Sequence, residues 1–502
     1  MDRSRDPARV ALTMRLRWIA SAWLLGACSA AVPPPAASIS QPPPQPPAAG
    51  AFDYSFRVDQ GLKKIEAELC LRDVVPAHLI YGARPGVPYL KNPRLISEGG
   101  VALSAARPLR VVDELIELGA VRAPACVAYE LDLAGAVEDG RLLLAYPCDG
   151  AIVTSTELFL WRPPRRAAEL SVRARFELPH GMRVSLPWPE RDGAYQLDET
   201  AFSFTGHAMF GRFERQRVPV PSGTIQLDTP AGFDEARRGW LATWVSNAGE
   251  VVSLATGRFP VTEAQVIVLP TSSAAFRFGH TGRSGGASIV LLMPRDIELE
   301  SLREDWIAIH EFSHLLHPFV RREDAWLSEG LATYLQEVLR VRAGMLDADA
   351  AWRRMYDGAA LGRDATGNLA SETLRMAHEA NYQTVYWAGA AIALMTDVEL
   401  RRRSEGRMSL DSALAALADE PRFMKVPASA QSLLAALDRA SQGSTFHDVA
   451  ARYLEGRELP DLSELYRELG LRDSGERAPL GWVRDAIMAP RLSRAELPLF
   501  AR

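Results

Sequence analysis

The stretch that decides the fold is His310-Glu311-Phe312-Ser313-His314, followed by Trp326-Leu327-Ser328-Glu329-Gly330. Two histidines four apart on a helix leave the same face one turn apart, so both imidazoles can reach one metal ion. Glu311 lies about 100° further round the helix, close enough to contact a water beside the ion without binding the ion. The spacing therefore predicts a metal site that carries its own general base.

A third ligand has to come from outside this helix, because a catalytic zinc site has three protein ligands and an open position. Glu329 follows His314 by fifteen residues, which leaves room for a loop and the start of a second helix. Apolar residues recur after the loop at helical spacing, as expected for a buried helix face: Leu327, Leu331, Ala332, Leu335 and Val338. We predict that His310, His314 and Glu329 bind Zn²⁺ and that Glu311 is the base.

Other interpretations of these residues stay open. Glu323 and Asp324 are rival third ligands, although a polar loop of this kind is usually a solvated charge run. His317 lies about 10 Å beyond His310 along a helix axis, so the two cannot easily share an ion. Glu329 could also be an exposed first-turn glutamate that is stabilised by the helix dipole.

The combination of HEFSH with WLSEGLATYL resembles the gluzincin metallopeptidases, especially the glycyl aminopeptidase family and its relatives in the aminopeptidase N group. The segment Val385-Tyr386-Trp387-Ala388-Gly389 resembles the Tyr-x-Lys-Gly helix of that family, with Ala388 in place of the lysine. The resemblance implies a peptide or protein substrate and assigns stabilisation of the oxyanion to Tyr386. A core aromatic is the alternative for Tyr386, and the other candidates for its role are Tyr382, His378 and His280.

The chain departs from the family in further respects. The gap from the second histidine to Glu329 is several residues shorter than usual, and the stretch after Leu471 is too short for the PDZ domain that the family often carries. In Gly285-Gly286-Ala287-Ser288, Ser288 occupies the place at which related aminopeptidases have a glutamate that binds the free amine of the substrate. This difference favours an endopeptidase or another terminal specificity, so the sequence leaves exopeptidase and endopeptidase open.

The predicted function is peptide hydrolysis by a zinc-activated water, with Glu311 moving the proton and Tyr386 steadying the oxyanion. One alternative is a non-catalytic surface lipoprotein that uses a peptidase-like fold to bind a protein or peptide partner. Another is a zinc hydrolase with a non-peptide substrate, because the ligand set does not encode the substrate.

Composition describes an ordinary globular protein. The 502 residues are 47% hydrophobic and 24% charged with a net charge of -5, which gives no electrostatic bias toward nucleic acid. The length allows two to four domains.

The amino-terminal sequence predicts export and attachment to a membrane. Residues 1–28 have the pattern of a signal peptide, and Leu25-Gly26-Ala27-Cys28 resembles the bacterial lipobox, in which the cysteine carries a lipid. We expect an extracytoplasmic protein that is lipid-anchored at Cys28 to a bacterial membrane in the cell envelope. An ordinary cleaved signal and a short membrane helix are the alternatives. Residues 29–50 are Pro-rich and predict an extended linker.

The fold class that the patterns predict is α+β multidomain. Alternating apolar and polar residues indicate an antiparallel β-rich domain over 51–235. Buried strands at 265–270 and 288–292 precede the metal helix and predict a catalytic domain over 236–400, which the resemblance makes thermolysin-like. Helical periodicity predicts a helical domain over 401–502.

Three cysteines remain once Cys28 carries the lipid, namely Cys70, Cys126 and Cys148. An extracytoplasmic compartment allows one disulfide among them, and the sequence alone cannot choose the pair. The pairing of Cys126 with Cys148 is favoured here, because each lies in or beside an expected strand with a polar turn between them.

Overall fold

The structure is a computed structural model. It describes residues 51–500 apart from 83, 142–143, 165–170, 274–276, 363–367, 455, 457 and 473–477. The predicted signal peptide 1–28, the lipid-bearing Cys28 and the linker 29–50 lie outside the described residues. No helix in the described part of the chain is long and apolar enough to cross a bilayer.

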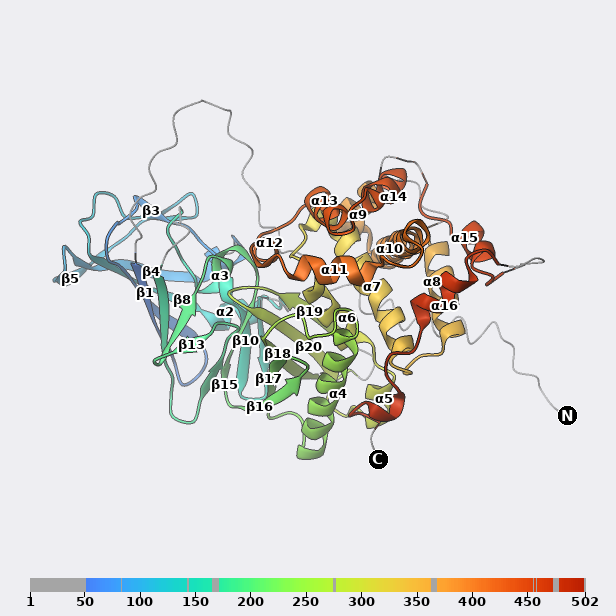
Figure 1. Cartoon of the computed structure of the whole chain (residues 1–502). Coiled ribbons are helices and arrows are strands. Elements are labelled where there is room, and N and C mark those ends of the chain that lie inside the picture. The colour runs from blue at the N-terminus through green and yellow to red at the C-terminus, as the bar shows by residue number, and fades with distance from the viewer. Residues whose placement is uncertain are drawn as a thin grey trace, which may run out of the picture.

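The amino-terminal region is built from β-strands, as predicted (Figure 1). Its largest sheet has eight strands in the order β13-β14-β11-β1-β2-β8-β4-β5. Residues alternate between buried and half-buried along β2, which is the period-two pattern expected of a strand with one face on a core. The strands of this sheet are β1 (Ala51–Val58), β2 (Lys64–Leu71), β4 (Leu90–Glu98), β5 (Val101–Pro108), β8 (Ala125–Asp132), β11 (Ser171–Glu177), β13 (Glu190–Arg191) and β14 (Ala194–Leu197).

Two smaller sheets complete this region. One has the order β12-β15-β10-β9 and the other β3-β7-β6. Their strands are β3 (His78–Leu79), β6 (Val111–Val112), β7 (Leu115–Glu117), β9 (Ala145–Cys148), β10 (Ala151–Ser155), β12 (Arg183–Ser185) and β15 (His207–Gly211). An aromatic core lies beneath the large sheet, where the Tyr54 hydroxyl donates to the Trp161 carbonyl (2.8 Å) and the Tyr129 hydroxyl to the Phe159 carbonyl (2.7 Å).

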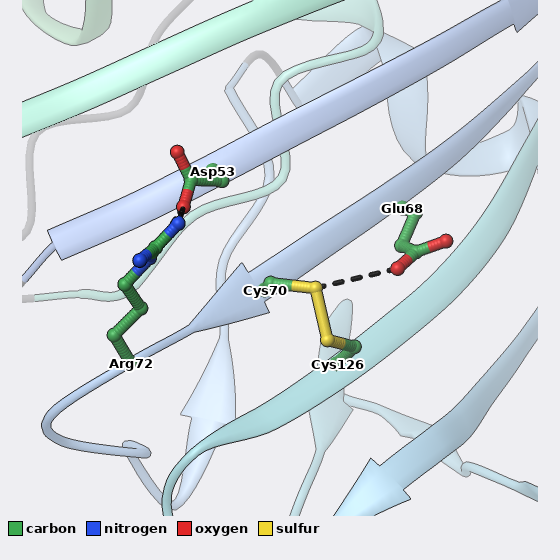
Figure 2. Close-up of a disulfide and its surroundings, with 5 residues drawn as sticks. All are labelled: Asp53, Glu68, Cys70, Arg72 and Cys126. Atoms are coloured by element: carbon green, nitrogen blue, oxygen red, sulfur yellow. Dashed lines mark hydrogen bonds and ion pairs between the residues drawn. A yellow bond between two sulfur atoms is a disulfide. The ribbon is translucent and has the colours of Figure 1, made fainter. Parts of the chain in front are cut away.

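The disulfide joins Cys70 to Cys126, so the favoured pairing of Cys126 with Cys148 is wrong. The antiparallel register of β2 and β8 places Cys70 opposite Cys126, with their Cα atoms 4.1 Å apart (Figure 2). Cys148 ends β9 in a different sheet, where its thiol is buried and free. Strand register between segments 56 residues apart decides the pair, and the sequence pattern does not contain that register.

The middle of the chain forms a five-stranded sheet in the order β16-β17-β18-β20-β19. Its strands are β16 (Phe213–Val220), β17 (Gly223–Pro230), β18 (Glu263–Thr271), β19 (Phe278–Gly282) and β20 (Ala287–Pro294). The first two strands precede residue 236 and still pair with the rest of this sheet. β19 is antiparallel to β20 and lies at the edge of the sheet.

Both faces of this sheet are covered, which explains the continuous apolar runs that predicted β18 and β20. Val266 and Ile289 belong to the core shared with the helices. Ile267 and Val290 point the other way, into a small cluster with Val153 and other residues of the four-stranded sheet. The second cluster joins the amino-terminal region to the middle of the chain.

Helices dominate the remainder of the chain, as expected. α4 (Glu235–Ser253) begins where the Asp234 side chain accepts from the Arg237 amide (2.8 Å). Then come α5 (Leu299–Arg303), α6 (Ile307–Ser313), α7 (Ala325–Arg342), α8 (Ala348–Ala360), α9 (Leu369–Glu379), α10 (Tyr382–Ser404), α11 (Leu410–Ala418), α12 (Pro421–Met424), α13 (Ala430–Ala440), α14 (Thr445–Leu454), α15 (Ser463–Glu468) and α16 (Gly481–Met488). A single hydrophobic core runs from Val218 to Leu499, so the predicted ranges 236–400 and 401–502 share it.

Candidate metal centre and active site

Helix α6 carries the first histidine and the predicted base. The helix starts beside Asp305, whose carboxylate accepts from the Ile307 amide (2.8 Å). It ends at Ser313, and His314 opens a short 3-10 turn over His314–Leu316. The two imidazoles lie next to each other across this change of helix type, with ring centroids 5.0 Å apart.

Helix α7 brings the third predicted ligand to the same point. The Glu329 Oε2 atom lies 3.2 Å from His310 Nε2 and 3.6 Å from His314 Nε2. One ligand atom from each of the three residues lies within 4.8 Å of the other two. Tetrahedral zinc ligands with bonds of about 2.0–2.2 Å lie about 3.3–3.6 Å apart. The three side chains therefore fit one zinc ion.

Burial and neighbouring charges shift the pKa values of Glu329 and His310 in opposite directions. Burial by itself would raise the pKa of Glu329, but the imidazoles of His314 and His310 lower it far below the ordinary range. Burial would likewise lower the pKa of His310, but the carboxylates of Glu329 and Glu311 raise it. The carboxylate is thus kept ionised, which is the form that binds a cation.

Glu311 is held beside the ligands by strand β19. The Thr281 hydroxyl donates to the Glu311 carboxylate (2.8 Å), and burial raises the pKa of Glu311 above its ordinary value. A Cβ atom on Gly279 would lie 2.5 Å from the Glu311 side chain, so only glycine fits at this point of the strand. Sequence reasoning missed Gly279 and Thr281, for which the glycine-bounded strand Phe278–Gly282 was the available signal.

Ser288 does not lie at the site, so it does not occupy the place that the resemblance gave it. It is fully buried in β20, where its hydroxyl donates to Gln265 (2.7 Å) and accepts from the His207 amide (2.9 Å). The strand that borders Glu311 is β19, and this strand contains no acidic residue. Ser288 therefore gives no reason to favour an endopeptidase over an exopeptidase.

Tyr386 reaches the site from α10. Its ring stacks on His310 with centroids 6.1 Å apart and an interplanar angle of 11°. Burial and the nearby carboxylates of Glu329 and Glu311 raise the pKa of Tyr386 well above its ordinary value. Helices α7 and α10 meet at two glycines, since a Cβ atom on Gly330 would lie 2.3 Å from the Gly389 backbone. This close contact brings Tyr386 and Glu329 together.

The rival candidates lie elsewhere or have other partners. His317 is buried with Nδ1 2.8 Å from its neighbour's carbonyl. Asp324 accepts from the Ala430 amide (2.8 Å), whereas Glu323 is exposed. Of the alternatives to Tyr386, His378 is exposed, Tyr382 packs against Tyr386 with ring centroids 6.4 Å apart, and His280 packs against the His207 ring with centroids 5.1 Å apart.

Two further polar residues that sequence reasoning missed orient the histidines. His310 Nδ1 lies 3.0 Å from Gln336 Oε1, and His314 Nδ1 lies 3.0 Å from Ser328 Oγ. Both come from α7, the helix that carries Glu329. The contacts on Nδ1 leave the Nε2 atoms directed at Glu329, as is usual for metal-binding histidines.

Comparison with known proteins rests on structure. No family model matches the chain, and no curated protein matches its sequence. An aminopeptidase N family protein from Idiomarina loihiensis superposes with a TM-score of 0.65 at 15% identity, covering 84% of this chain and 78% of the other. The chain has a gluzincin aminopeptidase-like fold.

Other structures with this fold agree. An M1 zinc metallopeptidase from Deinococcus radiodurans gives a TM-score of 0.52 at 18% identity, over 82% of this chain and 94% of that one. A mutant of that enzyme bound to a Tyr-Ser-Ala substrate gives a TM-score of 0.50 at 16% identity, covering 83% of this chain and 96% of that one. The resemblance predicted from the two motifs is thereby confirmed at the level of the fold, as is the α+β multidomain architecture.

Proposed function

We propose that this chain is a zinc-dependent metallopeptidase that hydrolyses peptide bonds. The observation that carries the proposal is the convergence of His310, His314 and Glu329 on one point, with the carboxylate of Glu311 held beside them. A zinc ion bound there would polarise a carbonyl and lower the pKa of a water.

Glu311 is suited to move protons in this reaction. Thr281 holds one oxygen of its carboxylate, which leaves the second oxygen to take a proton from the attacking water. The raised pKa of Glu311 lies closer to neutral pH, where a general base can both accept the proton and release it to the leaving amine. Glu311 would thus serve first as base and then as acid.

Tyr386 is suited to donate a hydrogen bond. Its raised pKa keeps the phenol protonated at neutral pH, so the hydroxyl can donate to the negative charge that develops on the carbonyl oxygen. Stacking on His310 restrains the ring before substrate arrives. The hydroxyl therefore needs little rearrangement during the reaction.

The strand beside the base supports a peptide substrate. β19 is an edge strand, and an extended peptide can add to such an edge through main-chain hydrogen bonds. The neighbour that was solved with Tyr-Ser-Ala binds a peptide on the same fold. We therefore propose a peptide or protein substrate, with cleavage position as the property to be measured.

We also propose that Cys28 anchors the protein to a bacterial membrane on its extracytoplasmic side. The lipobox-like tetrapeptide supports this address, and the Cys70–Cys126 disulfide agrees with an oxidising compartment. Metabolic labelling with a fatty acid should mark the full chain and not Cys28→Ala. Equal labelling of both would contradict the anchor.

The peptidase proposal is tested with a mixed peptide library before and after chelation. Cleavage should disappear on chelation and return with zinc, and the cut positions separate exopeptidase from endopeptidase. Protein that binds zinc stoichiometrically and cuts no peptide would contradict the proposal and favour a binding role.

A further inference from the structure

One buried acidic residue near the metal centre touches none of the predicted ligands. Glu337 follows Gln336 in α7, and its carboxylate accepts from the Gln336 side-chain amide (2.8 Å). Gln336 in turn places its Oε1 atom 3.0 Å from His310 Nδ1. Gln336 and Glu337 are only 5% and 1% exposed, so solvent does not compete for these contacts.

The hydrogen-bonding capacities of the three groups allow only one arrangement. A carboxylate accepts only, so it must receive the NH₂ group of Gln336, and the amide oxygen must then face the histidine. An amide oxygen also accepts only, which requires the proton on Nδ1 of His310. Nε2 is then the ring nitrogen left to face a metal, and it lies 3.2 Å from Glu329 Oε2.

Two arginines lie beside the carboxylate of Glu337. Arg340 on α7 and Arg354 on α8 each bring Nη1 to 3.6 Å from one of its oxygens. Their charges balance a carboxylate that is otherwise expensive to bury. The orientation of the Gln336 amide therefore depends on a carboxylate whose charge two arginines balance.

We propose that Glu337 is a positioning residue of the metal centre, which sets the metal-binding tautomer of His310 through the Gln336 amide. The inference rests on the proposed zinc function. Without the carboxylate the amide can turn by 180° and present NH₂ to His310, which favours the proton on Nε2. That tautomer cannot bind a metal through Nε2, so part of the zinc affinity is lost.

His314 provides an internal comparison. Its Nδ1 atom faces the Ser328 hydroxyl, which can donate or accept and therefore suits either tautomer. The tautomer of His314 should not respond to Glu337. A change in the His310 signals without a change in the His314 signals would distinguish an effect through Gln336 from a general loss of order at the site.

The test uses three variants and a control, with two measurements. Gln336→Met removes the acceptor, Glu337→Gln removes the group that fixes the amide, and the exchange Gln336→Glu with Glu337→Gln restores a fixed acceptor beside His310. Asp438→Asn is the control, because Asp438 is a buried carboxylate in α13 that bonds the Phe446 amide and His447. The measurements are zinc affinity by chelator competition and ¹⁵N signals of the histidines in zinc-free protein.

We expect about 10–100-fold weaker zinc binding for Gln336→Met and about tenfold for Glu337→Gln, as for other residues that orient metal ligands. The exchange should recover most of the affinity, and Asp438→Asn should change nothing. In zinc-free protein, His310 should carry a proton on Nδ1 and lose that proton in the two single variants, whereas the His314 signals stay unchanged.

The proposal is overturned if Glu337→Gln leaves the His310 signals as in the natural chain, or if the exchange fails to restore them. Should Glu337→Gln not fold, the exchange decides, because a carboxylate at position 336 should restore the His310 signals without one at position 337, whereas a packing role of Glu337 would leave them altered. Natural protein that binds no zinc would contradict the proposed function. The spectra of zinc-free protein would still test separately whether Glu337 controls the His310 proton through Gln336.

Discussion

The amino-terminal β region and the remainder of the chain are stabilised in different ways. The β region has its own aromatic core and a disulfide between two neighbouring strands, and it supplies none of the predicted site residues. The remainder shares one core from Val218 to Leu499 and holds all of the predicted site residues. The difference indicates that the site depends on contacts between the middle of the chain and its carboxy-terminal helices.

The α7–α10 contact illustrates that dependence. Glu329 and Tyr386 meet because Gly330 and Gly389 allow their helices to approach closely. Deeper in the same interface the Tyr334 hydroxyl donates to Asp397 (2.8 Å), which also accepts from the Leu410 amide (2.8 Å) that opens α11. The helices beyond the site thus help to position it.

The largest expected loss of activity comes from replacing the proposed base, Glu311. Glu311→Gln should lower kcat by about 10²–10⁴-fold, because the neutral amide cannot take a proton from water. Zinc content should stay near that of the natural chain, since Glu311 is not a predicted ligand. Glu323→Gln, an exposed change in the following loop, serves as the control. Near-normal peptide cleavage by Glu311→Gln would exclude Glu311 as the base.

Tyr386→Phe tests whether a residue from the shared core takes part in the chemistry. We expect about a 10²-fold lower kcat with little change in KM, because the lost hydrogen bond forms chiefly in the transition state. Tyr382→Phe is the matched control from the first turn of the same helix. Equal losses in both variants would indicate a structural role for Tyr386.

The disulfide tests whether the two regions are independent. Replacing both Cys70 and Cys126 by alanine should lower the free energy of unfolding of the β region by about 2–4 kcal/mol. Zinc binding and kcat should be retained, because no predicted site residue lies in this region. Chemical denaturation followed by tryptophan fluorescence, with activity measured in parallel, checks this. Parallel loss of activity would show that the regions are coupled.

A substitution at the Gly330–Gly389 contact tests how far the site depends on the packing of α7 against α10. Gly330→Ala should destabilise the protein by about 1–3 kcal/mol, because the added methyl group forces α7 and α10 apart. Gly239→Ala in α4 is the control, since a Cβ atom there meets nothing within 4 Å. Gly239→Ala should be neutral or slightly stabilising. Thermal melts of both variants, together with kcat for Gly330→Ala, measure the difference.

The smallest expected effect concerns Cys148. Burial, together with the charge of Asp149, raises the pKa of its thiol to about 12. The folded state therefore favours the protonated thiol, and this contribution to stability is complete below the ordinary thiol pKa and lost as pH rises toward 12. Native protein should resist alkylation at pH 8 and react once unfolded. Cys148→Ala should show a shallower loss of stability with rising pH, and an identical slope would contradict the shift.

Part of the site was predictable from the sequence because helix geometry is local. The four-residue spacing of His310 and His314 predicted neighbouring imidazoles, and the apolar spacing around Glu329 predicted the second helix. The structure places all three together. Tyr386 came from resemblance to a family, because residues that are 57 positions beyond Glu329 give no local signal of proximity.

The sequence by itself determined which residues share a helix face, which strands are buried on both sides and which motifs resemble a gluzincin. Tertiary structure alone decided that Cys70 pairs with Cys126, that β19 and Thr281 border Glu311, and that Gln336 and Glu337 stand behind His310. The physical reason is the range of the interactions. Helical and strand periodicity depend on neighbours within a few residues, whereas strand register and helix packing depend on how distant segments exclude solvent together.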